Sequence, residues 1–177
     1  MKLIPKPQHG EYPSYAEMYM KWMPDDGLLL QHLQTNFENT SRLVQSLTEE
    51  QLYLRYAPNK WTVKEVLVHI VDDERIYAYR AMCFGRNEKL ALPGFDQDEY
   101  ARYSDANDRD IDQIMIEYEA VRNATIALFD GFSDTALTRM GVADGNRATV
   151  RALGYHIAGH ELHHVHLLKA KYLNLQV

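Results

Sequence analysis

The chain has 177 residues, of which 46% are hydrophobic and 25% charged, the size and balance of one globular domain. Its net charge is -6 and it has no basic run, which disfavours nucleic-acid binding because phosphate neutralisation needs clustered Lys and Arg. A single cysteine, Cys83, excludes an internal disulfide. With no secretory h-region and no apolar stretch of membrane-spanning length, we expect a soluble cytoplasmic protein that binds no membrane.

The N-terminal segment, residues 1–24, is rich in Pro, Tyr and Met. Three prolines up to Pro13 exclude a long helix there, since proline lacks the amide hydrogen that a helix interior needs. The segment is therefore predicted to be an arm, held by its aromatic side chains on the main body of a single domain spanning residues 1–177.

Helical periodicity begins at Leu29. Apolar residues at three- and four-residue spacing predict a helix over residues 29–47, with Asp25 or Asp26 as its cap. The sequence TEEQ at 48–51 is a capping box for a short helix. A second capping box, TVKE at 62–65, predicts a long helix over residues 63–84, with Trp61 before it as a hydrophobic staple.

Residues 85–108 contain Pro-Gly and many acidic residues and predict a long connection with at most a short helical turn. A third helix is predicted over residues 110–129, and Thr149 is predicted to cap a fourth that reaches residue 173. MGVADGNRA at 140–148 is interpreted as a loop, and no segment alternates like a strand. The prediction is an all-α four-helix bundle with a long crossover between helices 2 and 3.

Four of the eight histidines lie in GHELHHVH, residues 159–166. His160 and His164 are one helical turn apart, so both imidazoles can reach one metal ion, and their stripe is otherwise apolar. Together with Glu161 they form H-E-x-x-H, the pattern of zinc proteases. Glu161 is interpreted either as a general base beside a metal-bound water or as an exposed helix residue.

A catalytic zinc usually has a third protein ligand, and the thirteen residues after His164 offer no suitable one. His69, on the inward face of the predicted second helix, is the best upstream candidate. Asp72 and Asp73 are candidates to orient a ligand imidazole or to add a carboxylate contact, or else they form a solvated acidic turn. Of His156, His163 and His166, at most one is expected to join His160 and His164 on the same metal. His163 is a candidate to line the mouth of the site or to support a ligand by hydrogen bonding.

Three segments together resemble the DinB-like (DinB/YfiT, damage-inducible) family: NKWTVKEVLVHIVDDERIYAYRA, LPGFDQDEY and GYHIAGHELHHVHLL. The resemblance spans nearly the whole chain. It implies a four-helix bundle that binds one divalent metal, zinc or nickel, through His69, His160 and His164. It also implies a homodimer, and for some relatives the transfer of low-molecular-weight thiols such as bacillithiol or mycothiol to electrophiles.

These observations leave three functional hypotheses. The first is a metal-dependent enzyme that activates a thiol or water against a small-molecule substrate, either a thiol S-transferase or a hydrolase. Cys83 lies about 20 Å along its helix from His69, so the thiol would come from a cosubstrate. The second is a non-catalytic, metal-stabilised binding or stress-response protein. The third, a zinc protease, is disfavoured because it needs a downstream ligand and a cleft beside a sheet.

Overall fold

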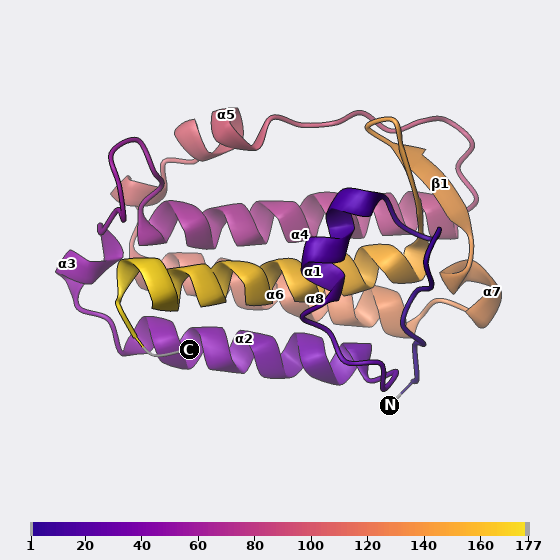
Figure 1. Ribbon diagram of the computed structural model, residues 1–177, viewed down its shortest axis with the longest axis horizontal. Coiled ribbons are helices and arrows are strands. Elements are labelled where there is room, and N and C mark those ends of the chain that lie inside the picture. Colours follow the sequence, from indigo (N-terminus) through magenta and orange to yellow (C-terminus); the bar gives the residue numbers. More distant parts are fainter. Residues whose placement is uncertain (1, 176–177) are drawn as a thin grey trace.

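A computed structural model describes residues 2–175. Four long helices form the predicted bundle (Figure 1). Their bounds are Leu29–Gln45 for α2, Val63–Gly85 for α4, Ile111–Asp130 for α6 and Val150–Leu167 for α8. Helices α2 and α8 run in one direction, and α4 and α6 in the other. Helix α4 packs against both α8 and α6, and α2 closes the bundle on the far side.

The crossover between α4 and α6 decides this topology. It returns along the whole length of α4, so that α6 begins at the same end of the bundle as α4 (Figure 1). Two short helical turns interrupt it, α5 (Gln97–Arg102) and the 3-10 helix η2 (Ala106–Asp108). A long crossover lets consecutive helices lie parallel, as the sequence allowed, and the fold is not a simple up-and-down bundle.

Most of the predicted caps are present. Thr48 and Thr62 each form a complete capping box, at the starts of α3 (Glu49–Leu52) and α4, and Thr149 caps α8. Asp110, which was not predicted as a cap, caps α6. The predicted cap of α2 is wrong, because Leu28 precedes this helix and no side chain caps it. Asp26 instead accepts a hydrogen bond from the Leu28 amide at 2.9 Å, and so shapes the turn before the helix. Helix α8 continues as the π-helical turn η3 (Leu168–Tyr172).

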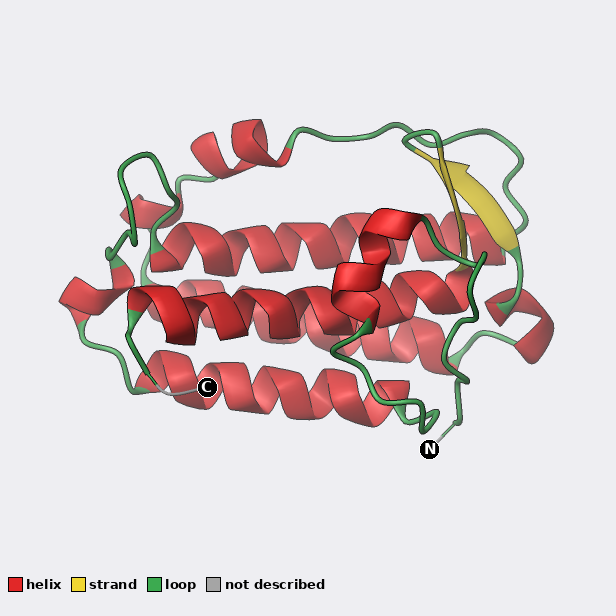
Figure 2. Cartoon of the chain, viewed as in Figure 1, coloured by secondary structure: helices red, strands yellow, loops and turns green. Residues whose placement is uncertain are grey.

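The prediction of no sheet is also wrong, because MGVADGNRA forms a β-hairpin (Figure 2). Strand β1 (Met140–Ala143) pairs antiparallel with β2 (Asn146–Thr149), after the short helix α7 (Asp134–Leu137). Asp144 and Gly145 both have positive φ, the backbone that a two-residue Asp-Gly hairpin turn requires. Four-residue strands are too short to show alternation, and the Asp-Gly pair was the available signal.

The N-terminal arm lies across α8 (Figure 1). It contains the 3-10 turn η1 (Ser14–Ala16) and the short helix α1 (Glu17–Met20). A Cβ on Gly159 would collide with the Tyr19 backbone, so this glycine admits the arm to the surface of α8. Between residues 2 and 175, no helix combines the length and the apolarity needed to cross a bilayer.

Candidate metal centre

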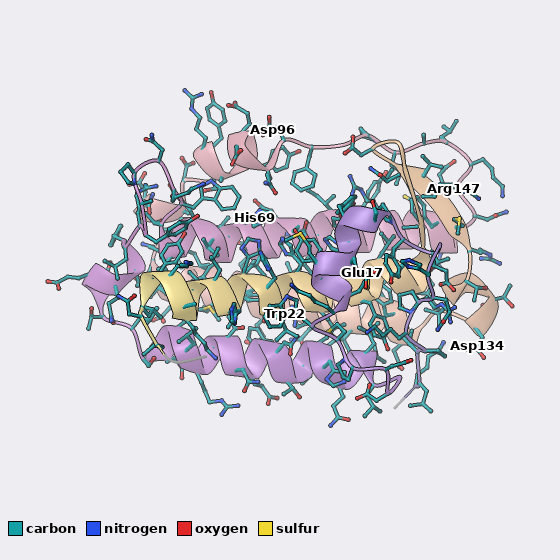
Figure 3. All side chains as sticks on the ribbon, in the orientation of Figure 1. Glu17, Trp22, His69, Asp96, Asp134 and Arg147 are labelled. Atoms are coloured by element: carbon teal, nitrogen blue, oxygen red, sulfur yellow. The ribbon has the colours of Figure 1, made fainter. Side chains whose placement is uncertain are left out.

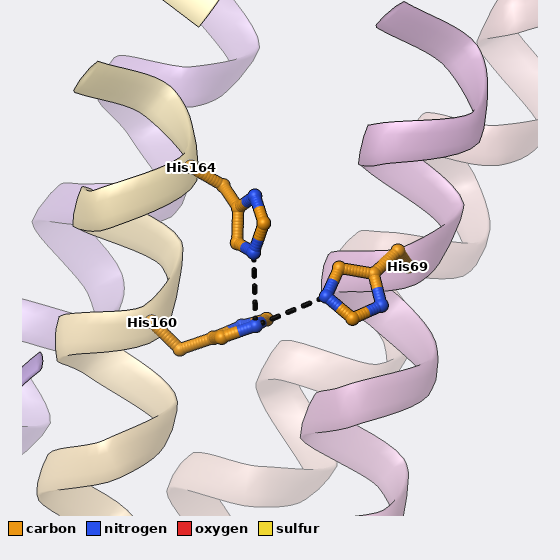
Figure 4. A group of neighbouring side chains, drawn as sticks. All are labelled: His69, His160 and His164. Carbon is orange, nitrogen blue, oxygen red and sulfur yellow. Dashed lines mark hydrogen bonds between the residues drawn. The ribbon is translucent and has the colours of Figure 1, made fainter. Parts of the chain in front are cut away.

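Three histidines from two antiparallel helices meet inside the bundle. His69 lies two turns into α4, and His160 and His164 lie on successive turns of α8 (Figures 3 and 4). The Nε2 atom of His160 is 3.1 Å from the Nε2 atoms of both other histidines. Their ligand atoms all lie within 4.8 Å of one another. Sequence spacing supplied the pair on α8, and the antiparallel packing of α4 against α8 brings in His69.

This arrangement fits a metal ion better than it fits hydrogen bonding. A neutral imidazole has one N–H and one lone pair, so His160 Nε2 cannot satisfy two other ring nitrogens at once. A tetrahedral ion with metal–nitrogen bonds of about 2.0–2.1 Å places its ligands about 3.3 Å apart. The observed separations of 3.1 Å are close to that edge length. One cation can therefore bind all three converging nitrogens.

The electrostatics of the cluster also suit ligands. Burial lowers the pKa of His69, and a smaller opposite effect comes from Asp73. Burial, followed by the neighbouring histidines, holds the pKa of His160 and of His164 well below the ordinary value. The imidazoles are therefore neutral at physiological pH, and neutral imidazole is the form that coordinates a metal.

Of the two candidate aspartates, only Asp73 reaches the histidines. It is 5% exposed, and its Oδ2 lies 3.4 Å from His160 Nδ1 and 3.3 Å from His156 Nε2. A carboxylate against the Nδ1 of a ligand histidine favours the tautomer that leaves Nε2 free for the metal. Asp72 turns away to Arg75, 3.7 Å distant. The alternative of a solvated acidic turn is therefore wrong for Asp73.

The other two candidate histidines lie on the arm side of the cluster. His156 is buried and stacks on Tyr77, with ring centroids 3.7 Å apart. His163 is half-buried, with its ring centroid 5.5 Å from that of Tyr19 and 5.2 Å from that of His164. Neither belongs to the three-histidine group.

Glu161 differs from both of its sequence interpretations. It is fully buried, which excludes an exposed helix glutamate. Its Oε1 accepts a hydrogen bond from Thr40 at 2.7 Å, and its Oε2 accepts one from Arg122 at 2.9 Å. Because these partners belong to α2 and α6, the carboxylate is directed away from His69 on α4. This geometry does not favour a general base at the metal.

Three aromatic residues at the cluster were missed in the sequence. The Trp61 ring packs against His69, with centroids 4.6 Å apart, in addition to its place before the capping box. Tyr19 from the arm contacts the rings of His156, His160 and His163. Tyr77 supports His156. The aromatic richness of the arm predicted packing, but only the fold shows that Tyr19 covers histidines.

A pocket of about 500 Å³ opens beside His164, at the end of the bundle where α4 begins. Helix α5 of the crossover forms one of its walls, and the charge of Asp98 on α5 acts on His69. Its lining combines aromatic, aliphatic and polar side chains: Tyr56, Trp61, Tyr172, Val66, Leu167, Asn59, Lys60, Gln97 and Asp98. A small molecule bound here would lie against His164.

Fold and site together define a helical bundle with an internal cluster of three histidines whose geometry can hold a metal ion. The family model of the DinB superfamily matches residues 32–168, and the chain belongs to this superfamily. The resemblance seen in the sequence is thereby confirmed. The matched range contains the whole histidine cluster and all four long helices except the first turn of α2.

Three similar proteins extend this assignment. A protein of Oceanobacillus iheyensis, named "Putative metal-dependent hydrolase", is 23% identical over 79% of this chain and 81% of its own length. YfiT from Bacillus subtilis, described as a probable metal-dependent hydrolase with an unusual four-helix bundle topology, superimposes with a TM-score of 0.71 at 16% identity. That alignment covers 98% of this chain and 95% of YfiT. The DinB-like protein YjoA of B. subtilis gives a TM-score of 0.59 at 16% identity, over 82% of this chain and 90% of YjoA.

Proposed function

We propose that this protein is a metal-dependent enzyme that binds one Zn²⁺ through His69, His160 and His164 and acts on a small molecule in the adjoining pocket. The observation that carries the proposal is the convergence of the three histidines between α4 and α8: His160 Nε2 lies 3.1 Å from the Nε2 atoms of His69 and His164, and all three ligand atoms lie within 4.8 Å of one another. Nickel is the second candidate, since imidazole is a good ligand for both ions.

Zinc bound by three neutral histidines keeps its full charge and an open coordination position, and so lowers the pKa of a water or thiol that binds there. The protein supplies the rest of the site. Asp73 orients His160, Trp61 packs on His69, and the pocket beside His164 orders the substrate. Glu161 is held by Thr40 and Arg122 and is not directed at the cluster.

The nucleophile of the proposed reaction is either water or a small thiol. In hydrolysis, a water oxygen bonds to the electrophilic carbon of an ester or amide, and the leaving group takes the proton. In thiol transfer, the sulfur of a cosubstrate bonds to the electrophile, a halide leaves, and the thiol proton goes to solvent. Ease of ionisation favours thiol transfer, because a thiol ordinarily ionises near pH 8.5 and water near 15.7.

The test uses protein purified without a nickel column and loaded with Zn²⁺. Hydrolysis of p-nitrophenyl acetate is compared with conjugation of several small thiols to 1-chloro-2,4-dinitrobenzene, and His69→Ala serves as the inactive control. Zinc-dependent turnover in one assay assigns the nucleophile. A protein that binds zinc stoichiometrically and turns over neither substrate is instead the non-catalytic binding protein. The homodimer expected from the family resemblance stays a prediction.

The zinc-protease interpretation gains no support from the site. The one sheet between residues 2 and 175 is the two-stranded hairpin, which lies at the opposite end of the bundle from the pocket (Figure 1). Glu161, which a protease of this kind would use as its base, is held by Arg122 and Thr40.

A further inference from the structure

A second buried polar cluster lies behind the histidines, and its centre is Arg122 on α6. Its guanidinium is fully enclosed and forms ion pairs with Glu74 at 2.8 Å and Glu161 at 2.9 Å. The Glu74 side chain is 1% exposed and the Glu161 side chain 0%. We call Arg122, Glu74, Glu161 and Thr40 the ion cluster. Burial alone would lower the pKa of Arg122, but the carboxylates, Glu161 foremost, raise it well above its ordinary value.

The ion cluster joins all four long helices. Arg122 donates to Glu74 on α4 through both Nε and Nη2, to Glu161 on α8 through Nη2, and to the Leu33 carbonyl on α2 through Nη1. Thr40 on α2 donates to the free oxygen of Glu161 at 2.7 Å. A planar guanidinium has a fixed fork of donors, so these bonds specify position and angle as well as charge.

The two glutamates of the ion cluster directly follow residues at the histidine cluster. Glu74 follows Asp73 on α4, and Glu161 follows His160 on α8. Consecutive helical residues point about 100° apart, so each helix presents one residue to the histidines and the next to Arg122. When one guanidinium holds both glutamates, it fixes the rotation and the axial register of α4 relative to α8. That relation sets the distance between His69 and His160.

Stability alone does not account for such a cluster. Two carboxylates and one guanidinium lose their hydration when the protein folds, and this desolvation opposes their mutual attraction. A buried ion pair of this kind is often no more stabilising than apolar side chains of equal volume. Its distinctive property is directional bonding. We propose that Arg122 is a positioning residue, which acts through Glu74 and Glu161 to hold the three metal ligands in coordinating geometry. This inference rests on the proposed metal-binding function and gives the glutamate of H-E-x-x-H a role other than general base.

The test variant is Glu161→Gln, which keeps the size of the side chain and removes its charge. The matched control is Glu117→Gln, which removes the same charge from two partly exposed ion pairs, with Arg75 on α4 and with Arg109 just before α6. A milder pair is Thr40→Val, which removes the hydroxyl bonded to Glu161, and Thr40→Ser, which keeps it. The Thr40 pair decides the question if Glu161→Gln does not fold.

Two readouts separate positioning from general stability. The first is titration of each folded variant with Co²⁺ against a chelator, recording affinity and the visible d–d spectrum, which reports ligand geometry. The second is the set of histidine-ring NMR signals of the metal-free protein. We expect Glu161→Gln to bind Co²⁺ about 10–100-fold more weakly, with a changed spectrum and shifted His160 and His164 ring signals. Thr40→Val should change in the same direction, and Glu117→Gln and Thr40→Ser should match the parent.

The outcomes distinguish this inference from the proposed function. If folded Glu161→Gln keeps the parental affinity, spectrum and ring signals, the ion cluster does not position the ligands, although the metal site stands. If the parent binds no Co²⁺ but the ring signals move in Glu161→Gln and not in Glu117→Gln, the proposed function fails and the positioning role stands. Equal changes in Glu161→Gln and Glu117→Gln indicate a general charge effect and overturn the inference.

Discussion

Two polar clusters lie inside this bundle, and they differ in whether their polar atoms find partners within the protein. The ion cluster is closed, and its carboxylates and guanidinium bond to one another. The three histidines are neutral, His160 Nε2 can hydrogen-bond to only one of the two ring nitrogens beside it, and a pocket opens beside His164. A buried group without a partner costs stability, so an unsatisfied cluster beside a satisfied one points to a ligand from outside.

The largest effect on stability is expected when the ion cluster is broken. Arg122→Met leaves two carboxylates buried without a counter-charge, and removing one partner of a buried ion pair costs about 3–5 kcal/mol. Urea denaturation should show this loss in the free energy of unfolding. Arg75→Met is the control, because the Arg75 side chain is 47% exposed and its pair should contribute less than about 1 kcal/mol. Equal losses in the two variants would mean that the ion cluster is not a structural centre.

Substitution within the histidine cluster should instead remove the metal. His160 stands between the other two ligands, so His160→Ala should weaken zinc binding by more than the roughly 10–100-fold typical of changing a ligand's hydrogen-bond partner. The metal-dependent part of the stability should disappear with it. Elemental analysis of protein purified without a nickel column measures the metal, with His166→Ala as the matched control on the same helix. The assigned site is refuted if His160→Ala and the parent retain equal metal.

The cover of the histidine cluster can be tested separately. An Ala side chain at Gly159 would press on the Tyr19 backbone and displace the arm, and overpacking of this kind costs about 1–3 kcal/mol. Thermal unfolding should show the loss, and limited proteolysis should show faster cleavage near Tyr19. Gly131→Ala is the control, because its Cβ would meet only ordinary contacts, the nearest at 3.4 Å. If thermal unfolding and cleavage near Tyr19 are both unchanged in Gly159→Ala, the arm accommodates the added methyl group without loss of stability, and the prediction is wrong.

The smallest and most gradual effect is expected from pH. Burial lowers the pKa of His69, His160 and His164 in the folded protein, whereas their pKa in the unfolded chain is near 6.5. Below that pH the unfolded chain binds more protons than the folded one, so the free energy of unfolding of the metal-free protein falls as the pH drops. Metal should dissociate over the same interval, because protons compete for the ligands. Denaturation and metal retention between pH 8 and 5 test this, and a flat profile contradicts it.

The sequence predicted the histidine cluster better than the ion cluster. The one-turn spacing of His160 and His164 on an apolar stripe makes the pair recognisable in the sequence, and His69 lies on a long helix with a strong capping box. Arg122 and Glu74 give no comparable signal, because charged residues on helices usually face solvent. Their burial depends on four helices closing around them. The hairpin was missed for a related reason, since four-residue strands carry little pattern and its turn was the only local cue.

The sequence by itself determined the helices, most of their caps and the one-turn spacing of His160 and His164 on α8. These features depend on residues within one or two turns of each other, so local spacing specifies them. The tertiary structure decided which side chains face each other across the bundle. It placed His69 opposite His160, Asp73 against His160 Nδ1 and Glu161 on Arg122. The physical reason is that each of these contacts depends on the relative rotation and register of two helices, which no single stretch of sequence encodes.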